Sequence, residues 1–470
     1  MGGIPLNPIE NPEEEGKFYL YTLTKDGVIE EYIVLNNVAT RVYSFELTIP
    51  AEDLLQLTPI FTASERIYTI QYYGDNKESL GSYSYKYKDK LSANANAPIY
   101  YNKSDAGLEP NMRWTFVGWI NEKDFENDVS NPVYIDEETF EITYDMKLFA
   151  RCVEEDCTKI ATDWKYFNFV EVKVPDYNKV IFTNPSGYVP NNAVSSTNAD
   201  ISIGTKWSIS IKEKYRKHLG GKVTIPTYTD SSRQHPVEII NDMSNMDLMT
   251  EVFFLDDSLC IGTYPAASGK GFYHTDVLKA VHFQKEFKYL GYAAFNLSGI
   301  KTVDFPADSK LEYIGNRAFG NCSNLEITSL PDTVNYLGES AFYNSPNLAL
   351  TSLPLGLTQI RESVFMNCYG MKVNTFGRTV GNVELGATEN NIELICHDAF
   401  NGVGNNVGIT EIHLKDSVKS IGNSAFYMFG DVSQELLVED NTGIIRDKYD
   451  TNGVAIEAQV FGSRRISYVD

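Results

Sequence analysis

A short motif that returns six times in the C-terminal half constrains the fold more than any other feature. The complete form is an aliphatic residue, Gly, two variable residues, Ala and Phe, as in Ile314-Gly315-x-x-Ala318-Phe319. Its Phe positions lie 24, 23, 23, 35 and 26 residues apart and are Phe295, Phe319, Phe342, Phe365, Phe400 and Phe426. A unit this short cannot bury its own apolar face, so the copies are expected to stack as a solenoid with one Phe per coil in an internal column.

A second motif runs in phase with the first and predicts one short strand per coil. It is an apolar residue, two variable residues and then apolar-x-apolar, as in Ile300-x-x-Val303-x-Phe305, and Pro306 follows. The alternation has the period of a strand, and Pro ends it because Pro cannot donate a ladder hydrogen bond. The coils that begin at Leu325 and Leu348 keep the ends of the motif but place Thr in the middle. The predicted fold class is therefore mostly β, with small N-terminal β-domains before a solenoid that carries a short-stranded parallel sheet.

The residues after the turn complete a family pattern. Asn321-Cys322-x-Asn324-Leu325 follows the second complete copy of the turn, and Asn367-Cys368 follows a degraded copy with Arg361 at the Gly position. Together with the turn, these residues resemble the BspA-like class of leucine-rich repeats, over about half of the chain. The resemblance implies a non-enzymatic protein that binds host or partner-cell proteins.

The variable residues of each strand should point outward on the concave face of such a solenoid. The predicted protein-binding residues are Thr302, Asp304, Ile327, Ser329, Leu350, Ser352, Glu411 and His413, with Ala280 and His282 at the equivalent positions of an earlier coil. We expect an apolar centre made by Ile327 and Leu350, because a contiguous exposed apolar patch is a typical protein-contact site. The alternative is that an insertion covers these two side chains, or that they are scattered.

The N-terminal half predicts further β-modules. Trp114-Thr115-Phe116-Val117-Gly118-Trp119, between alternating segments and Leu148-Phe149-Ala150, resembles the internalin B-repeat β-grasp module, which implies a spacer. A capping helix is predicted between Ser210 and Gly220, because Ile211, Tyr215 and Leu219 share one helical face there. The alternative is a basic partner-binding patch of Lys212, Lys214, Arg216 and Lys217. The predicted divisions are an arm (1–16), a small β-domain (17–65), the β-grasp-like module (66–157), a connector (158–221) and the solenoid (222–470).

Composition and motifs argue against several classes of function. The net charge of −23 opposes binding to nucleic acid, and no apolar run approaches the ~18 residues that membrane insertion needs. Cys152 and Cys157 could form a disulfide or half of a metal site, but no second pair accompanies them, so two unrelated thiols explain them better. Since no phosphate loop, zinc helix or other catalytic motif occurs, we expect neither an enzyme nor a cofactor or metal.

Two settings fit a binding protein of this kind. The first is a phage virion protein that recognises the host surface as part of a larger assembly, because residues 1–16 form an acidic, Pro-bearing arm without the features of a signal peptide. Its partners would be other virion subunits, or a cell-surface protein or glycan. The second setting is a cell-surface or secreted adhesin of the BspA-like class that binds host or partner-cell proteins.

Overall fold

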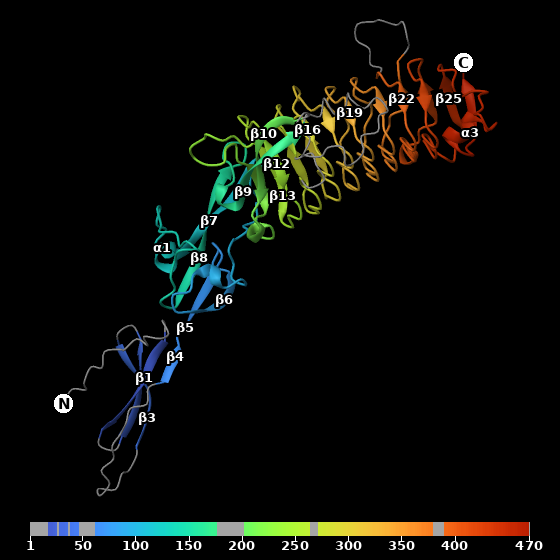
Figure 1. Cartoon of the computed structure of the whole chain (residues 1–470). Helices are drawn as coiled ribbons and strands as arrows, with labels where there is room; N and C mark the ends of the chain where they lie inside the picture. The colour runs from blue at the N-terminus through green and yellow to red at the C-terminus, as the bar shows by residue number, and fades with distance from the viewer. Residues whose placement is uncertain are drawn as a thin grey trace. The chain divides into compact units, whose positions relative to one another are not determined.

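The chain divides into two compact units in a computed structural model (Figure 1). The model describes residues 17–25, 28–35, 38–46, 62–175, 202–263, 271–378 and 390–469. One unit comprises residues 1–103 and 114–153, and the other comprises residues 104–113 and 154–470. The predicted arm, residues 1–16, lies outside the described residues. No helix in the described part of the chain has the length and apolar character needed to cross a lipid bilayer.

The first unit contains two four-stranded sheets. Strands β1 (Lys17–Lys25), β2 (Val28–Leu35), β3 (Val38–Glu46) and β4 (Thr62–Glu65) form an antiparallel sheet in the order β3-β2-β1-β4. Strands β5 (Ile67–Tyr73), β6 (Ser79–Lys86), β7 (Met112–Asn121) and β8 (Met146–Asp156) form a mixed sheet in the order β6-β5-β8-β7, with β5 and β8 parallel. A short 3-10 turn (Leu91–Ala93) and helix α1 (Glu122–Glu126) lie between strands.

Aromatic side chains fill the core under the mixed sheet. Tyr72 from β5 meets Trp119 from β7 edge to face, with ring centroids 4.9 Å apart, and Phe116 lies 5.1 Å from the same Trp119. The strands therefore fall where the alternating segments predict them, while the β-grasp assignment and the domain limits stay predictions. Cys152 and Cys157 are separate free thiols, and burial raises the pKa of Cys157 to about 11 and that of Cys152 to about 12.

The second unit begins with an antiparallel pair of strands. After a 3-10 turn (Trp164–Tyr166), β9 (Phe167–Pro175) pairs with β10 (Ser202–Ile211), and β10 then pairs in parallel with β12 (Ile239–Asp242). The predicted capping helix over Ser210–Gly220 is wrong, because Ser210 and Ile211 end β10 and only Glu213–Tyr215 form a 3-10 turn. Ladder pairing of Ile211 with Phe167 outweighs the local helical pattern. An edge pair of strands thus takes the place of the helix at the start of the parallel stack.

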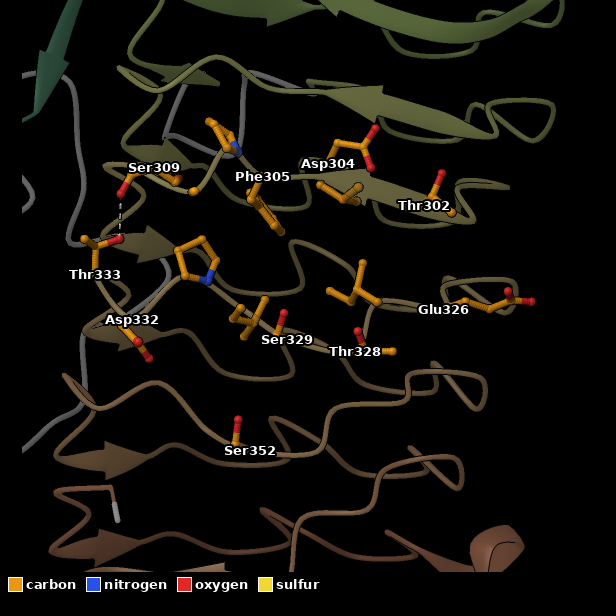
Figure 2. Close-up of a pocket in the computed structure, with 16 residues that line it drawn as sticks. Thr302, Asp304, Phe305, Ser309, Glu326, Thr328, Ser329, Asp332, Thr333 and Ser352 are labelled. Carbon is orange, nitrogen blue, oxygen red and sulfur yellow. Dashed lines mark hydrogen bonds between the residues drawn. The ribbon is translucent and has the colours of Figure 1, made fainter. Parts of the chain in front are cut away.

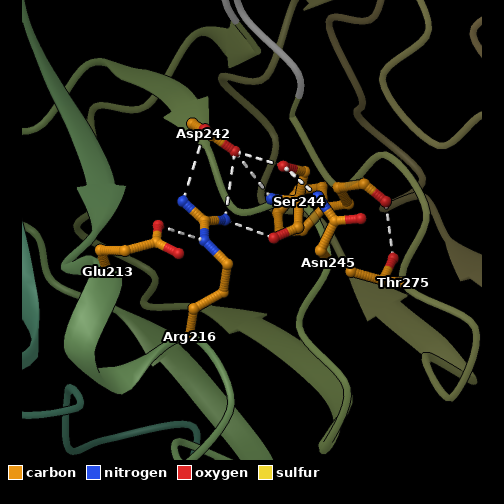
Figure 3. A network of polar contacts seen from close by, with 7 residues as sticks. Glu213, Arg216, Asp242, Ser244, Asn245 and Thr275 are labelled. Atoms are coloured by element: carbon orange, nitrogen blue, oxygen red, sulfur yellow. Dashed lines mark hydrogen bonds and ion pairs between the residues drawn. The ribbon is translucent and has the colours of Figure 1, made fainter.

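The side chain of Arg216 is engaged within the fold rather than presented as part of a basic patch. Its guanidinium forms ion pairs with Glu213 (2.9 Å) and Asp242 (3.4 Å) and donates to the carbonyl of Ser244 (Figure 3). Ser244 in turn donates to Asp242 through both its main-chain N–H and its hydroxyl. This network ties the turn after β10 to the loop after β12, which favours a structural role for Arg216.

From residue 221 onward most coils contribute short parallel strands to two series of sheets. The first sheet is β11 (Gly221–Ile225), β13 (Met249–Phe254), β15 (Ala280–His282) and β17 (Thr302–Asp304). The second continues from β12 through β14 (Gly262–Thr263), β16 (Tyr289–Leu290), β18 (Tyr313–Ile314) and β19 (Tyr336–Leu337). This arrangement confirms the predicted solenoid with short parallel strands. The prediction of one strand per coil is wrong, because the aliphatic residue before the motif Gly, such as Leu290 or Ile314, belongs to a second short strand.

Further along the chain both series resume as separate sheets. One is β20 (Gln359–Ile360), β22 (Leu394–Ile395) and β24 (Ser420–Ile421); the other is β21 (Thr375–Phe376), β23 (Glu411–Leu414), β25 (Leu436–Asp440) and β26 (Ile466–Val469). A 3-10 turn (Asn405–Val407) and helix α3 (Ile456–Phe461) complete the unit. Each series is therefore interrupted once among the described coils.

The six motif phenylalanines form the predicted internal column. Successive rings are stacked with centroids 5.1 to 5.5 Å apart, from Phe295 through Phe319, Phe342, Phe365 and Phe400 to Phe426. The column also has two members that the motif does not reveal. Phe272 stacks on Phe295 at 5.1 Å, and Phe461 of α3 stacks on Phe426 at 5.8 Å.

The Gly of the motif is required by the close approach of neighbouring coils. A Cβ atom added to Gly338 would lie 2.4 Å from the main-chain N of Asn316 and 2.6 Å from the C of Gly315. The equivalent residue of the next coil is Arg361, and the sheet that contains β19 ends there. The guanidinium of Arg361 lies 4.4 Å from the ring centroid of Tyr336. Cys396 stands at the same motif position further along, in a coil whose strand β22 (Leu394–Ile395) pairs on both sides.

Candidate binding groove on the strand face

The outward side chains of the first sheet begin a surface that we call the strand face. It consists of the exposed side of β11, β13, β15 and β17 and of the next two coil segments, Glu326–Leu330 and Ala349–Leu353. In β17, Val303 points into the core while Thr302 and Asp304 are exposed. Thr302 and Asp304 therefore face outward as expected, and their role as contact residues stays a prediction.

The next two coils change register, and the predicted apolar centre is wrong. Ile327 is 6% exposed and Leu350 is 0% exposed, whereas Thr328 and Thr351 face solvent. The apolar pattern here is Leu-x-Ile-x-x-Leu rather than Leu-x-x-Val-x-Phe, so the inward position moves by one residue. Burial of an Ile or Leu side chain is worth roughly 1.5–3 kcal/mol, and it decides which residue turns inward. The centre of the strand face is consequently polar, and neither coil segment forms a strand.

A groove of about 690 Å³ lies where β17 meets the first of these coils (Figure 2). It is lined by Thr302, Val303, Asp304, Phe305, Pro306, Ala307, Ser309, Glu326, Ile327, Thr328, Ser329, Leu330, Pro331, Asp332, Thr333 and Ser352. Volumes of this size are typical of binding clefts. Figure 2 shows the labelled hydroxyls and carboxylates carried by successive coils along the groove.

The groove brings together five of the eight predicted residues. Thr302, Asp304, Ile327, Ser329 and Ser352 line it, although Ile327 contributes from a buried position. Leu350 belongs to the core, and Glu411 and His413 lie on β23, in a different sheet. The prediction missed Phe305, Glu326, Thr328 and Asp332, although Thr at the central strand position was a signal that the register changes there.

Asp304 ends a row of charged side chains that crosses three strands. His282 on β15 lies between Glu251 on β13 (Nε2 to Oε2, 3.4 Å) and Asp304 (Nδ1 to Oδ2, 2.5 Å), and its ring stacks on Phe253. Burial alone lowers the pKa of His282, but the two flanking carboxylates together outweigh it and raise the pKa above its ordinary value. His282 therefore links β13 and β15 to the groove wall through its contacts with Glu251 and Asp304.

The sheet that contains β23 carries a similar arrangement. His413 Nδ1 lies 2.5 Å from Glu439 Oε2, and Lys415 Nζ lies 2.9 Å from Glu439 Oε1. Hydrogen bonds from Lys415 and His413 lower the pKa of Glu439 to about 2. Glu439 thus accepts from both Lys415 and His413 within this sheet.

The chemistry of the groove is that of recognition. Its hydroxyls donate and accept hydrogen bonds and its carboxylates accept them, on a framework held by the buried side chains of Val303, Ile327 and Leu330. Within the described ranges, no cluster of three or more His, Cys, Asp or Glu side chains is arranged to hold a metal ion.

The stacked coils, the Phe column and the paired parallel sheets define a leucine-rich-repeat solenoid. Residues 268–372 and 374–448 match the family described as BspA type leucine rich repeat region, in six copies. The C-terminal half of this chain is therefore built from BspA-type leucine-rich repeats. None of the curated proteins compared with the chain matches it in sequence.

Several solved structures are similar to this chain. The leucine rich repeat protein of T. pallidum is 16% identical, over 52% of this chain and 89% of that protein, with a TM-score of 0.33. A leucine rich cell surface protein of Faecalibacterium prausnitzii is 16% identical, over 56% and 91%, with a TM-score of 0.28. The pneumococcal vaccine antigen PcpA is 16% identical, over 56% and 94%, with a TM-score of 0.21.

Proposed function

We propose that this chain is a non-enzymatic adhesin of the BspA-like class, which binds proteins of a host or partner cell at the cell surface or in the extracellular space. The observation that carries the proposal is the groove in the strand face, together with the family match of the repeats that build it. Repeats of this family are typical of binding proteins rather than enzymes.

The rigidity of the framework supports a binding role. The groove lies on coils whose inward residues are packed in the solenoid core, as Leu325 and Leu330 are around Ile327. A surface that is held in place before contact loses little conformational entropy on binding. Thr302, Asp304, Ser329 and Ser352 are the predicted residues that we retain for this role, with Glu326, Thr328 and Asp332 added.

Two predictions from the sequence do not enter this proposal. Glu411 and His413 as contact residues stay a prediction, because they lie on a different sheet from the groove. The virion setting also stays a prediction; it depended on residues 1–16, which lie outside the described residues.

A cell-binding assay with matched variants tests the proposal. The labelled full chain is applied to bacterial and mammalian cells before and after mild proteolysis of the cell surface. We expect binding to be lost after proteolysis and to fall strongly in Ser329→Trp, where the indole would fill the groove. Ser323→Trp is the control, because Ser323 is equally exposed on a neighbouring stretch but does not line the groove. Binding that survives both proteolysis and Ser329→Trp would contradict the proposal.

A further inference from the structure

The main-chain hydrogen bonds of β17 show which of its groups face the groove. The N–H of Thr302 donates to the carbonyl of Lys279 (3.0 Å), and the carbonyl of Asp304 accepts from the N–H of Phe283 (3.0 Å). Thr302 and Asp304 therefore direct their main-chain groups toward β15. Because successive residues of a strand direct these groups to opposite sides, the N–H and C=O of Val303 face the following coil.

That following coil does not complete the ladder. Between residues 301–307 and 326–331, the only main-chain hydrogen bond among the described residues runs from the N–H of Glu326 to the carbonyl of Lys301 (2.8 Å). At the other end of the groove the coils are tied again, where the hydroxyl of Thr333 donates to the carbonyls of Ser309 (3.2 Å) and Leu311 (2.6 Å). Between these two ties the segments separate, and β17 is the last strand of its sheet.

The change of register explains this open edge. Ile327 turns into the core one position earlier than Val303 does in its coil, so Glu326–Leu330 cannot continue as a strand beside β17. An edge strand with unpaired N–H and C=O groups is a template for pairing with another chain. The groove thus presents main-chain groups as well as side chains.

The charge of the lining selects among possible occupants. Asp304, Glu326 and Asp332 line the groove, and none of its lining residues is Lys, Arg or His. Asp304 is paired with His282 and Glu326 with Lys301 (3.3 Å) at the rim, while Asp332 is exposed. Since the whole chain carries a net charge of −23, an anionic occupant is disfavoured both in the groove and on approach.

We propose that the groove binds an extended, basic peptide segment of the partner protein by strand addition to β17, an inference that rests on the proposed function and specifies its partner. The main chain of the segment pairs with Val303, and its Lys or Arg side chains reach Asp304, Glu326 and Asp332. Strand addition takes its affinity from main-chain hydrogen bonds and its specificity from side-chain contacts. Because β17 spans only Thr302–Asp304, the charged contacts have to supply much of the binding.

Peptides of matched composition test this proposal on the full chain. The probes are a capped Lys-Thr-Val-Lys-Thr-Val-Lys peptide, the same peptide with Glu in place of Lys, and a basic version N-methylated at its central residues. Binding is measured by fluorescence anisotropy at low salt. We expect the basic peptide to bind, and the acidic and N-methylated peptides to bind at least about tenfold more weakly, because like charge and a missing N–H donor each remove favourable contacts.

Variants of the chain locate the binding site. Asp332→Asn should weaken binding of the basic peptide by about two- to fivefold, as for the loss of one exposed charge contact. Asp308→Asn should leave it unchanged, because Asp308 is exposed on the same coil as β17 but does not line the groove. Equal binding of the N-methylated peptide, preference for the acidic peptide, or displacement of the basic peptide by a neutral oligosaccharide overturns the proposal.

The two proposals fail in different ways. If Ser329→Trp abolishes cell binding but the basic peptide does not bind up to about 1 mM, a weak affinity by any standard, strand addition of a basic segment is wrong and the adhesin proposal stands. If the peptide binds in the groove but the chain does not bind cells, or binds them equally after proteolysis of their surface, the adhesin proposal is wrong.

Discussion

Removal of one ring from the Phe column should destabilise the solenoid strongly. Phe319 is 0% exposed and stacks between Phe295 (5.1 Å) and Phe342 (5.3 Å). A buried Phe removes roughly 150–200 Å² from water, which at about 25 cal/mol per Å² corresponds to about 4–5 kcal/mol. Ala retains a small part of this, and a cavity remains, so Phe319→Ala is expected to lower the free energy of unfolding by about 3–5 kcal/mol.

The loss should be concentrated near the substitution, because each coil contacts only its neighbours. Native-state hydrogen exchange resolves this: amides in the coils of Phe295, Phe319 and Phe342 should exchange about 10²–10⁴-fold faster, while those of distant coils change little. The matched control is Asn324→Ala, an exposed residue of the same coil, for which a change within ±0.5 kcal/mol is expected. A near-neutral effect of Phe319→Ala, or an effect spread evenly over the chain, would refute the column as the stabilising element.

Three further predictions concern register, close packing and pH. Leu350→Ala should lower the free energy of unfolding by about 2–5 kcal/mol, and Ser352→Ala by less than about 0.5 kcal/mol; chemical denaturation that ranks them the other way would restore the register expected from the sequence. Gly338→Ala should lower the melting temperature, because its Cβ would lie 2.4 Å from the N of Asn316 and overpacking destabilises by about 1–3 kcal/mol. An unchanged melting temperature would show that the two coils can move apart without loss of stability. The pKa of His282 is raised in the folded chain, so its contribution to stability is fully present below its ordinary pKa of 6.5 and is lost as pH rises through the folded pKa. The difference in free energy of unfolding between the native chain and His282→Gln should therefore shrink over that pH range. A difference independent of pH would exclude the link from the imidazolium to Glu251 and Asp304.

The repeat itself could be predicted from the sequence because its cause is local and periodic. The Phe residues return every 23 to 26 residues except for one gap of 35, and the same turn motif surrounds each of them. Stacking of identical units then leaves one arrangement that buries every ring. Phe272 and Phe461 escaped the prediction because they occupy the same column without the surrounding motif.

The outward surface could not be predicted with the same accuracy. Ile327 and Leu350 differ from Val303 by one position relative to the start of their coils, and a shift of one residue exchanges buried and exposed positions. Whether such a coil keeps the strand register or buries its Ile depends on the core of the neighbouring coils. The helix predicted over Ser210–Gly220 failed for a related reason, since pairing of β10 with β9 outweighed a helical pattern of three residues.

The sequence alone thus determined the solenoid, its Phe column, the orientation of Thr302 and Asp304 and the class of repeat. The groove was decided only by the tertiary structure, because it exists where two adjacent coils with different registers fail to pair. A periodic pattern reports which residues each coil buries, whereas a gap between coils arises from the mismatch of two patterns in space. That mismatch opens the edge of β17 and surrounds it with Asp304, Glu326 and Asp332.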